Sequence, residues 1–417
     1  MTHKVHLQPW LFKINSRTAQ TMLALAFGLV LSAMLAQPSQ AQTYTVLYTF
    51  TGGTDGGQPY SGLIRDHAGN LYGTTYASGD ITACGLFRGC GVVYKLDPSG
   101  NETVIHTFEG NSDGREPEWG NLLVDQADNL WDMTVYGGEG SLGLGVVYKI
   151  SKTGEESIVH RFAGGPNDGE EPQGGLIQDK DGTFYGTTAA GGSGPFGDCG
   201  TVFQMYKSGE LTILHSFIGT DGCQPNASLV TDAAGNMYGM TSTGGTAGYG
   251  VVFKITKAGA LTVLHSFTGQ PDGAFPVGIL ALDKAGNIYG TTPGGGDPAC
   301  TTANEGCGLV FKIDTNGEEH ILHSFLHSDG GNPYAGVVLD TAGNIYGTTT
   351  GFAKYNWGSI YKLDRKENFT KLYDFTGGDD GGFPFAAMTL DEPSRTLYGT
   401  AYLGGASGYG VVFKLTK

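Results

Sequence analysis

The fold is decided by a repeated stretch whose most regular copy reads Gly278-Ile279-Leu280-Ala281-Leu282-Asp283-Lys284-Ala285-Gly286-Asn287-Ile288-Tyr289-Gly290-Thr291-Thr292. Two short runs of apolar and β-branched residues flank a polar Gly-Asn turn, which is the pattern of a β-hairpin. Related copies occur seven times in the 417 residues. The chain is therefore a tandem repeat, and the repeat has to be explained before any single residue.

Four landmarks define each repeat. An Asp-Gly-x-x-Pro turn begins at Asp55, Asp113, Asp168, Asp221, Asp272, Asp329 and Asp380, with spacings of 58, 55, 53, 51, 57 and 51 residues. The hairpin's first strand follows, and its second, Tyr-Gly-Thr-Thr type strand begins at Tyr72, Trp131, Tyr185, Tyr238, Tyr289, Tyr346 and Tyr398. A Val-Val-Phe-Lys type strand begins at Val92, Val146, Thr201, Val251, Leu309, Ser359 and Val411, and a Leu-His-Ser-Phe type strand comes next. Each repeat thus predicts four strands of about five residues.

Four antiparallel strands in each of seven repeats predict an all-β fold, a seven-bladed β-propeller. We call the strands a to d, from the axis outwards. The run 44–50 matches strand d, whereas the last repeat stops after strand c at 411–415. We expect the N-terminal strand to pair with the last repeat and close the ring, which removes the open sheet edges that a solenoid would have to cap.

Residues 1–41 have the character of a signal peptide. Three basic residues precede an apolar run at 22–36, and a cleavage signal of small residues ends at Ala41. The rest, 42–417, is expected to form a single propeller domain without a membrane span, because no later stretch reaches about 18 apolar residues. We therefore expect a secreted or periplasmic protein, cleaved near Ala41.

The charge of the chain limits its partners. Forty acidic residues outnumber 24 basic ones, and the net charge is −16. No cluster of Lys and Arg supplies the basic face that nucleic acid requires, so we expect no nucleic-acid partner. A glycan, a peptide or a cell-surface protein remains, and the chain is expected to be a monomer.

Six cysteines in an exported chain are expected to form disulfides. Two pairs bracket corresponding loops four repeats apart, namely Cys84 with Cys90 and Cys300 with Cys307. The remaining pair comprises Cys199, which ends a b–c loop, and Cys223, which lies in the next d–a loop. These two loop types share one face of the propeller, so a bridge between them is compatible with the predicted fold.

The run 278–292, together with Gly250-Val251-Val252-Phe253-Lys254-Ile255 and Leu264-His265-Ser266-Phe267, resembles the Gloeo/Verruco (GloVer) tandem repeat of exported bacterial proteins. The resemblance covers essentially everything after the predicted leader, and a looser similarity to NHL and Kelch-like propellers concerns the fold alone. It implies an exported, propeller-like repeat protein and brings no catalytic residues. Relatives carry varied C-terminal anchors, and this sequence departs from them in lacking one, so the resemblance does not extend to surface attachment.

Polar residues that recur in every repeat are best explained by the blade itself. The hairpin aspartates and the aspartates of the Asp-Gly-x-x-Pro turns are expected to cap turns rather than to bind calcium. Histidines recur at one position of strand d, at His106, His160, His215, His265 and His323. Equivalent outer positions of neighbouring blades lie too far apart for metal–ligand bonds of about 2 Å. We therefore predict no metal site and no cofactor.

Residues that differ between repeats are better candidates for a site. The position after the turn proline leads into strand a, at the mouth of the central channel, and reads Tyr60, Glu118, Gln173, Asn226, Val277, Tyr334 and Phe385. Blades six, seven and one thus form an aromatic arc, and blades two to four form a polar arc. Blade two also has one extra residue after its turn proline, in a stretch that contains Trp119. Stacking surface opposite hydrogen-bonding groups suits a glycan or a peptide.

We infer a non-enzymatic binding propeller that uses the face of the b–c and d–a loops. The predicted ligand-binding residues are Tyr60, Glu118, Trp119, Gln173, Asn226, Tyr334 and Phe385. A polysaccharide lyase or glycoside hydrolase is the alternative, and it requires two carboxylates about 5 to 9.5 Å apart at the mouth. Blades two and three supply the pool for it, Glu116, Glu118, Asp132, Glu170 and Glu171. A purely structural surface repeat is the third possibility, and no residue is assigned as catalytic.

Overall fold

The computed structural model describes residues 42–80, 82, 84, 89–110, 112–138, 143–194, 198–300 and 306–416. Within it, Thr43–Thr416 is one compact unit. The predicted leader, residues 1–41, lies outside the described residues. In the part of the chain that the structure describes, no helix has the length and apolar character needed to cross a membrane.

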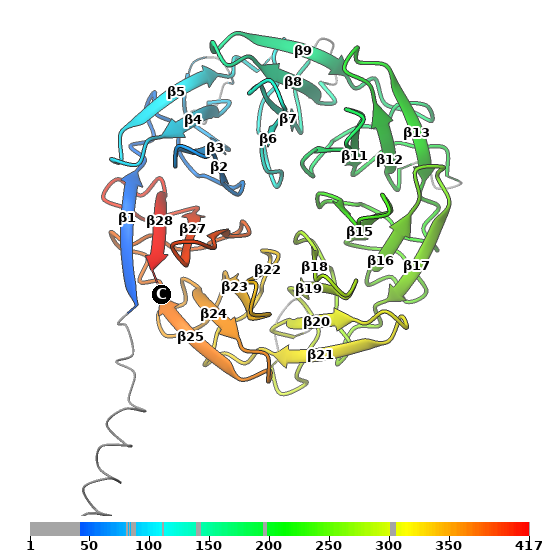
Figure 1. The fold of residues 1–417 in the computed structure, drawn as a ribbon, viewed down its shortest axis with the longest axis vertical. Helices are drawn as coiled ribbons and strands as arrows, with labels where there is room; N and C mark the ends of the chain where they lie inside the picture. The colour runs from blue at the N-terminus through cyan, green and yellow to red at the C-terminus, as the bar shows by residue number, and fades with distance from the viewer. Residues whose placement is uncertain are drawn as a thin grey trace, which may run out of the picture. The chain divides into compact units, whose positions relative to one another are not determined.

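Seven four-stranded antiparallel sheets surround a central axis (Figure 1). The innermost strands are β2 (Ile64–Arg65), β6 (Leu123–Val124), β10 (Ile177–Gln178), β14 (Val230–Thr231), β18 (Ala281–Leu282), β22 (Val338–Leu339) and β26 (Thr389–Asp391). The second strands are β3 (Leu71–Thr75), β7 (Leu130–Thr134), β11 (Phe184–Thr188), β15 (Met237–Thr241), β19 (Ile288–Thr292), β23 (Ile345–Thr349) and β27 (Thr396–Ala401). The third strands are β4 (Val92–Leu96), β8 (Val146–Ile150), β12 (Thr201–Met205), β16 (Val251–Ile255), β20 (Leu309–Ile313), β24 (Ser359–Leu363) and β28 (Val411–Thr416). The outer strands are β1 (Thr43–Thr49), β5 (Glu102–Thr107), β9 (Glu156–Arg161), β13 (Leu211–Ser216), β17 (Leu261–Ser266), β21 (Glu319–Ser324) and β25 (Phe369–Asp374).

The seven-bladed propeller predicted from the repeats is therefore confirmed. Blades one to six each use four consecutive strands, starting with β2–β5, and blade seven combines β26, β27 and β28 with β1. The apolar cores lie between neighbouring sheets. Phe217 of blade three, for example, packs edge-on against Phe253 of blade four, with ring centroids 5.2 Å apart.

Strand β1 closes the ring as the outer strand of blade seven. It pairs with β28 along its length, from Thr43 opposite Thr416 to Thr49 opposite Val411. Its register shifts by one residue between Val46 and Tyr48. Each of the other six outer strands carries the same one-residue bulge, so β1 has the local geometry of an outer strand as well as its position.

The innermost strands differ from the prediction of about five residues, since six have two residues and β26 has three. Near the axis, neighbouring blades approach each other too closely for longer pairing within one blade. A Cβ atom on Gly336 of blade six would lie 2.0 Å from the Ile279 carbonyl oxygen of blade five. The small residues at the starts of these strands are therefore contacts between blades.

Each d–a turn is built around its aspartate. In the turn after blade three, one carboxylate oxygen of Asp221 accepts the Ile218 N–H at 2.8 Å, and the other lies 2.8 Å from Nε2 of His215. Five turns have such a pair, His106–Asp113, His160–Asp168, His215–Asp221, His265–Asp272 and His323–Asp329, at 2.7 to 3.3 Å. In the other two turns, Tyr48 and Tyr373 donate to Asp55 and Asp380. The turn aspartates therefore cap their turns, as the sequence predicted.

The hairpin aspartates use their oxygens in the same local way. Asp283 accepts the backbone N–H groups of Ala285 and Asn287 on one oxygen. Its other oxygen accepts the Asn287 side-chain amide at 2.7 Å and the Tyr289 hydroxyl at 3.1 Å. These bonds account for the recurring Asp-x-x-Gly-Asn pattern as turn chemistry.

All six cysteines are paired as predicted. The bridges are Cys84–Cys90, Cys199–Cys223 and Cys300–Cys307. Three bridges indicate that this protein works in an oxidising environment outside the cytoplasm.

Three glutamates, called the seam glutamates below, lie where the outer strands of neighbouring blades approach each other. Glu102, Glu156 and Glu319 each begin an outer strand, and each has one buried carboxylate oxygen without a hydrogen-bond partner in the described structure. Burial raises the pKa of Glu102 to about 7, and the neighbouring Asp55 carboxylate adds to this effect. Burial likewise raises the pKa of Glu319 to about 7, beside the His265–Asp272 pair of the preceding blade.

Deleting Thr43–Thr49 should lower the melting temperature sharply, because β28 loses its partner and the ring opens. An excess of a synthetic peptide with the sequence of β1 should restore part of the loss, since a ligand that binds only the folded state stabilises it. Thermal unfolding with and without the peptide measures both effects. An unchanged melting temperature after the deletion would contradict ring closure by β1.

The seam glutamates should make stability depend on pH. A carboxyl group whose folded-state pKa is raised binds more protons in the folded than in the unfolded state, so the free energy of unfolding falls as pH rises from about 4.5 through 7. The Glu102→Gln/Glu319→Gln double variant should have a smaller slope than the parent, with the remainder due to buried carboxyl groups such as Glu118 and Asp132, and should melt above the parent at pH 8. Glu210→Gln, at an exposed turn, is the control and should keep the slope.

Candidate functional site

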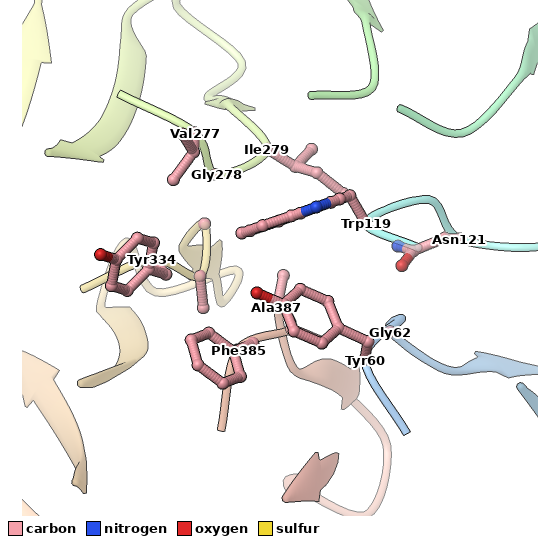
Figure 2. Close-up of a pocket in the computed structure, with 13 residues that line it drawn as sticks. Tyr60, Gly62, Trp119, Asn121, Val277, Gly278, Ile279, Tyr334, Phe385 and Ala387 are labelled. Carbon is pink, nitrogen blue, oxygen red and sulfur yellow. The ribbon is translucent and has the colours of Figure 1, made fainter. Parts of the chain in front are cut away.

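Aromatic side chains from four blades meet at the axis (Figure 2). The Tyr60 and Phe385 rings stack with centroids 4.7 Å apart and planes 11° apart. Trp119 packs edge-on against Tyr60 at 4.7 Å, and its centroid lies 6.4 Å from that of Tyr334. Tyr402 contacts both stacked rings edge-on, at 5.3 and 5.5 Å. We call these five residues the axial cluster, and each of its side chains is partly exposed.

Trp119 brings two opposite sides of the ring together. It lies in the stretch between Pro117 and Asp125 where blade two has one residue more than the other blades, and Figure 2 shows its indole reaching towards Val277 and Tyr334 of blades five and six. The backbone accommodates the extra residue with a tight turn, in which the Gly120 N–H donates to the Glu118 carbonyl and Trp119 has φ +50°. The insertion seen in the sequence therefore has a specific structural effect.

The rings of the cluster leave little space between them. The cavity between its rings and the small residues of the inner segments has a volume of about 10 Å³. This is about the space of one water molecule. On the side of blades one, two, five, six and seven, the predicted channel mouth is thus lined by aromatic rings and small residues.

Glu118 is the member of the polar arc that joins the aromatic cluster. Its carboxylate accepts the Trp119 Nε1–H at 3.1 Å. Burial raises the pKa of Glu118 to about 7, with a further contribution from the Glu116 carboxylate, while the bond from Trp119 opposes the rise. Glu118 therefore changes its charge near neutral pH.

The other predicted residues of the polar arc stand apart from this cavity. Neither Gln173 nor Asn226 is among the residues that line it, whereas Val277 is. The Asn226 amide donates to Ser242 Oγ at 3.3 Å, and its Oδ1 is buried without a partner among the described residues. The structure thus brings together Tyr60, Glu118, Trp119, Tyr334 and Phe385 of the predicted set.

A second ring of residues was recognised only in part from the sequence, which named Glu116 and Glu171 among the carboxylates of the enzymatic alternative. The residue before each turn proline has a positive φ of 52° to 61°, which is uncommon outside glycine; these residues are Gln58, Glu116, Glu171, Gln224, Phe275, Asn332 and Phe383. Each N–H donates to a carbonyl in the b–c loop of the preceding blade, at 2.7 to 3.1 Å. Backbone strain of this kind concentrates at functional sites. The ring shares the polar arc of blades two to four with the mouth but not its aromatic arc, because blades one and six carry Gln58 and Asn332 here and the aromatic residues lie in blades five and seven.

Two other carboxyl groups of the enzymatic pool have raised pKa values. Asp132 in β7 replaces a glycine that the other six blades have at this position, and burial raises its pKa to about 7. It lies under the backbone of Gly120, where a Cβ atom would be 2.9 Å from its Oδ1. Burial also raises the pKa of Glu170, with contributions from Asp198 and Glu171. Asp132 and Glu170, like Glu118, are not among the residues that line the axial cavity.

The fold has counterparts among solved structures. Virginiamycin B lyase from Staphylococcus aureus is 12% identical, with a TM-score of 0.57, and the match covers 90% of this chain and 99% of the lyase. A gluconolactonase from Xanthomonas campestris is 14% identical with a TM-score of 0.44, covering 92% of each chain. At these identities the similarity to the lyase concerns the fold alone, and the gluconolactonase match carries no argument.

The comparison at the level of sequence families gives the decisive match. No curated protein matches the chain. The Gloeobacter/Verrucomicrobia repeat matches residues 80–303 and 299–417, which confirms the resemblance seen in the repeats. The chain belongs to the Gloeobacter/Verrucomicrobia repeat family.

Proposed function

We propose that this propeller is an exported binding protein that recognises a neutral glycan on the face where its b–c and d–a loops meet. The observation that carries the proposal is the axial cluster. Four blades contribute partly exposed rings to one cluster, and the stretch of blade two that has the extra residue contributes the indole that contacts rings of blades one and six. Aromatic rings present large apolar faces with little conformational entropy to lose, which suits stacking against a sugar ring.

The negative charge of the protein favours some classes of glycan over others. The chain has a net charge of −16, and Glu116, Glu118 and Glu171 stand on the polar side of the mouth. An anionic sugar would meet like charges there, whereas hydroxyl groups of a neutral sugar can donate to the carboxylates and amides. A neutral glycan therefore fits better than a uronate-rich or sulfated one.

A second candidate, hydrolysis of a bound glycan, is favoured by one observation. Burial keeps the pKa of Glu118 near 7, the value expected of a general acid at neutral pH, and Glu116 lies close enough to influence it. Incubation of the protein with the glycans it binds, followed by mass spectrometry, tests this. Products that disappear with Glu118→Gln would favour the enzyme, and unchanged glycans would favour pure binding.

Trp119→Ala should weaken glycan binding by about tenfold or more, which corresponds to about 1.4 kcal/mol. A glycan array followed by calorimetry measures the loss. Tyr206→Ala is the matched control, because Tyr206 is 47% exposed in the turn between β12 and β13, on the opposite face. Peptide binding in place of glycan binding would correct the ligand class, and full affinity of the Trp119 variant would contradict the site.

Binding should strengthen as pH rises from 6 to 8. The Glu118 carboxyl loses its proton over this range, and the ionised form is the better acceptor for sugar hydroxyls. Glu118→Gln should bind with an affinity that no longer changes over this range. Calorimetric titrations of both proteins at three pH values provide the measurement, and a parallel slope in the variant would assign the dependence to another group.

A further inference from the structure

A sulfur–imidazole cluster lies on the rim of blade five, away from the axial cluster. Cys300 and Cys307 lie in the loop between β19 and β20, and both are fully buried. His327, exposed in the turn after β21, places Nδ1 at 3.6 Å and Nε2 at 3.8 Å from the Cys300 sulfur. One donor atom from each of these three residues lies within 4.8 Å of the other two.

The imidazole is held in this position by blade six. The His327 carbonyl accepts the Ala353 N–H at 3.0 Å, and the ring packs edge-on against Phe352 with centroids 4.3 Å apart. Phe352 and Ala353 both have positive φ, at 57° and 59°. On the sulfur side, the Cys307 carbonyl accepts the Asn332 N–H at 2.9 Å. The three donor groups are therefore positioned by backbone contacts from both blades.

Blade one provides a natural comparison. Its corresponding loop carries the Cys84–Cys90 bridge, but Gly110 occupies the place of His327, two residues after the buried phenylalanine that follows the outer strand. A Cβ atom on Gly110 would lie only 2.4 Å from the Cys84 sulfur. Blade one thus has no room for a side chain over its sulfurs, whereas blade five presents an imidazole there.

The sulfur–imidazole spacing matches a tetrahedral metal site, whereas the two sulfurs, which are bonded to each other in the disulfide, must separate to about 3.8 Å to bind one ion. Zinc binds thiolate at about 2.3 Å and imidazole at about 2.0 to 2.1 Å, so donor atoms on one zinc ion lie about 3.5 to 3.8 Å apart. The Cys300 sulfur and the His327 nitrogens already have this separation. Two sulfurs and one imidazole would leave a fourth position for water or another ligand.

We propose that, once the Cys300–Cys307 disulfide is reduced, Cys300, Cys307 and His327 bind one thiophilic divalent cation of the zinc type. A dithiol reductant opens the disulfide by exchange. Its two thiols are oxidised to a disulfide, and each cysteine gains one electron and one proton. The cation then displaces the two thiol protons, because thiolate is the form that binds metal. Metal and disulfide exclude each other, so the redox state controls the site.

Cobalt(II) titration of the reduced protein tests the proposal, because thiolate coordination gives a sulfur-to-cobalt absorption band that oxygen ligands do not give. We expect one equivalent to bind with this band and to be displaced by zinc. The oxidised protein and the reduced Cys300→Ser/Cys307→Ser variant should show no band. The reduced Cys84→Ser/Cys90→Ser variant should behave as the parent, because its blade-five ligands are intact.

His327→Ala separates a three-residue site from ordinary binding to free thiols. His327 is exposed, so the variant should fold, and circular dichroism checks this for every reduced protein. We expect its cobalt affinity to fall at least tenfold. Equal affinity of the His327 variant and the parent, a band that survives the loss of Cys300 and Cys307, or no stoichiometric band in the folded reduced parent would each overturn the proposal.

Discussion

The carboxylate of the turn aspartate is the interaction on which the rest of the ring depends. In every d–a turn it accepts a backbone N–H just beyond the outer strand and a bond from a histidine or tyrosine on that strand. The chain thereby turns from the rim back to the axis at a fixed angle. The positions of the turn proline and of the mouth residue in the next blade therefore depend on this turn.

The fold was predictable because the same pattern of strands and turns occurs seven times. An assignment that is uncertain in one repeat is therefore supported by the other six. The ring closure followed from a single extra strand at 44–50, and the disulfide between Cys199 and Cys223 followed from the face on which their loops lie. The length of the innermost strands was not predictable from propensity. It is limited by contacts between blades, such as Gly336 against Ile279, and these depend on how closely seven sheets can approach one axis.

The site could be predicted only in part. Comparison of the repeats identified Tyr60, Tyr334, Phe385 and the unusual Trp119, but not that an indole would span the axis, because this depends on the ring's diameter. The same comparison set aside recurring residues, correctly for the aspartates that cap turns. It also overlooked His327, which stands where the other six repeats have a glycine and becomes notable only where the fold brings it against two sulfurs.

The pairing of β1 with β28 has a consequence for how the molecule is made. These strands lie at opposite ends of the described propeller, so β1, which is synthesised first, has no partner until β28 has been synthesised. Six blades can assemble from neighbouring segments, but the seventh requires a contact across nearly the whole chain, the slowest kind to form. Until β28 is made, β1 has no partner strand and its backbone hydrogen-bonding groups stay exposed. A prematurely terminated chain that lacks β28 keeps this unpaired strand.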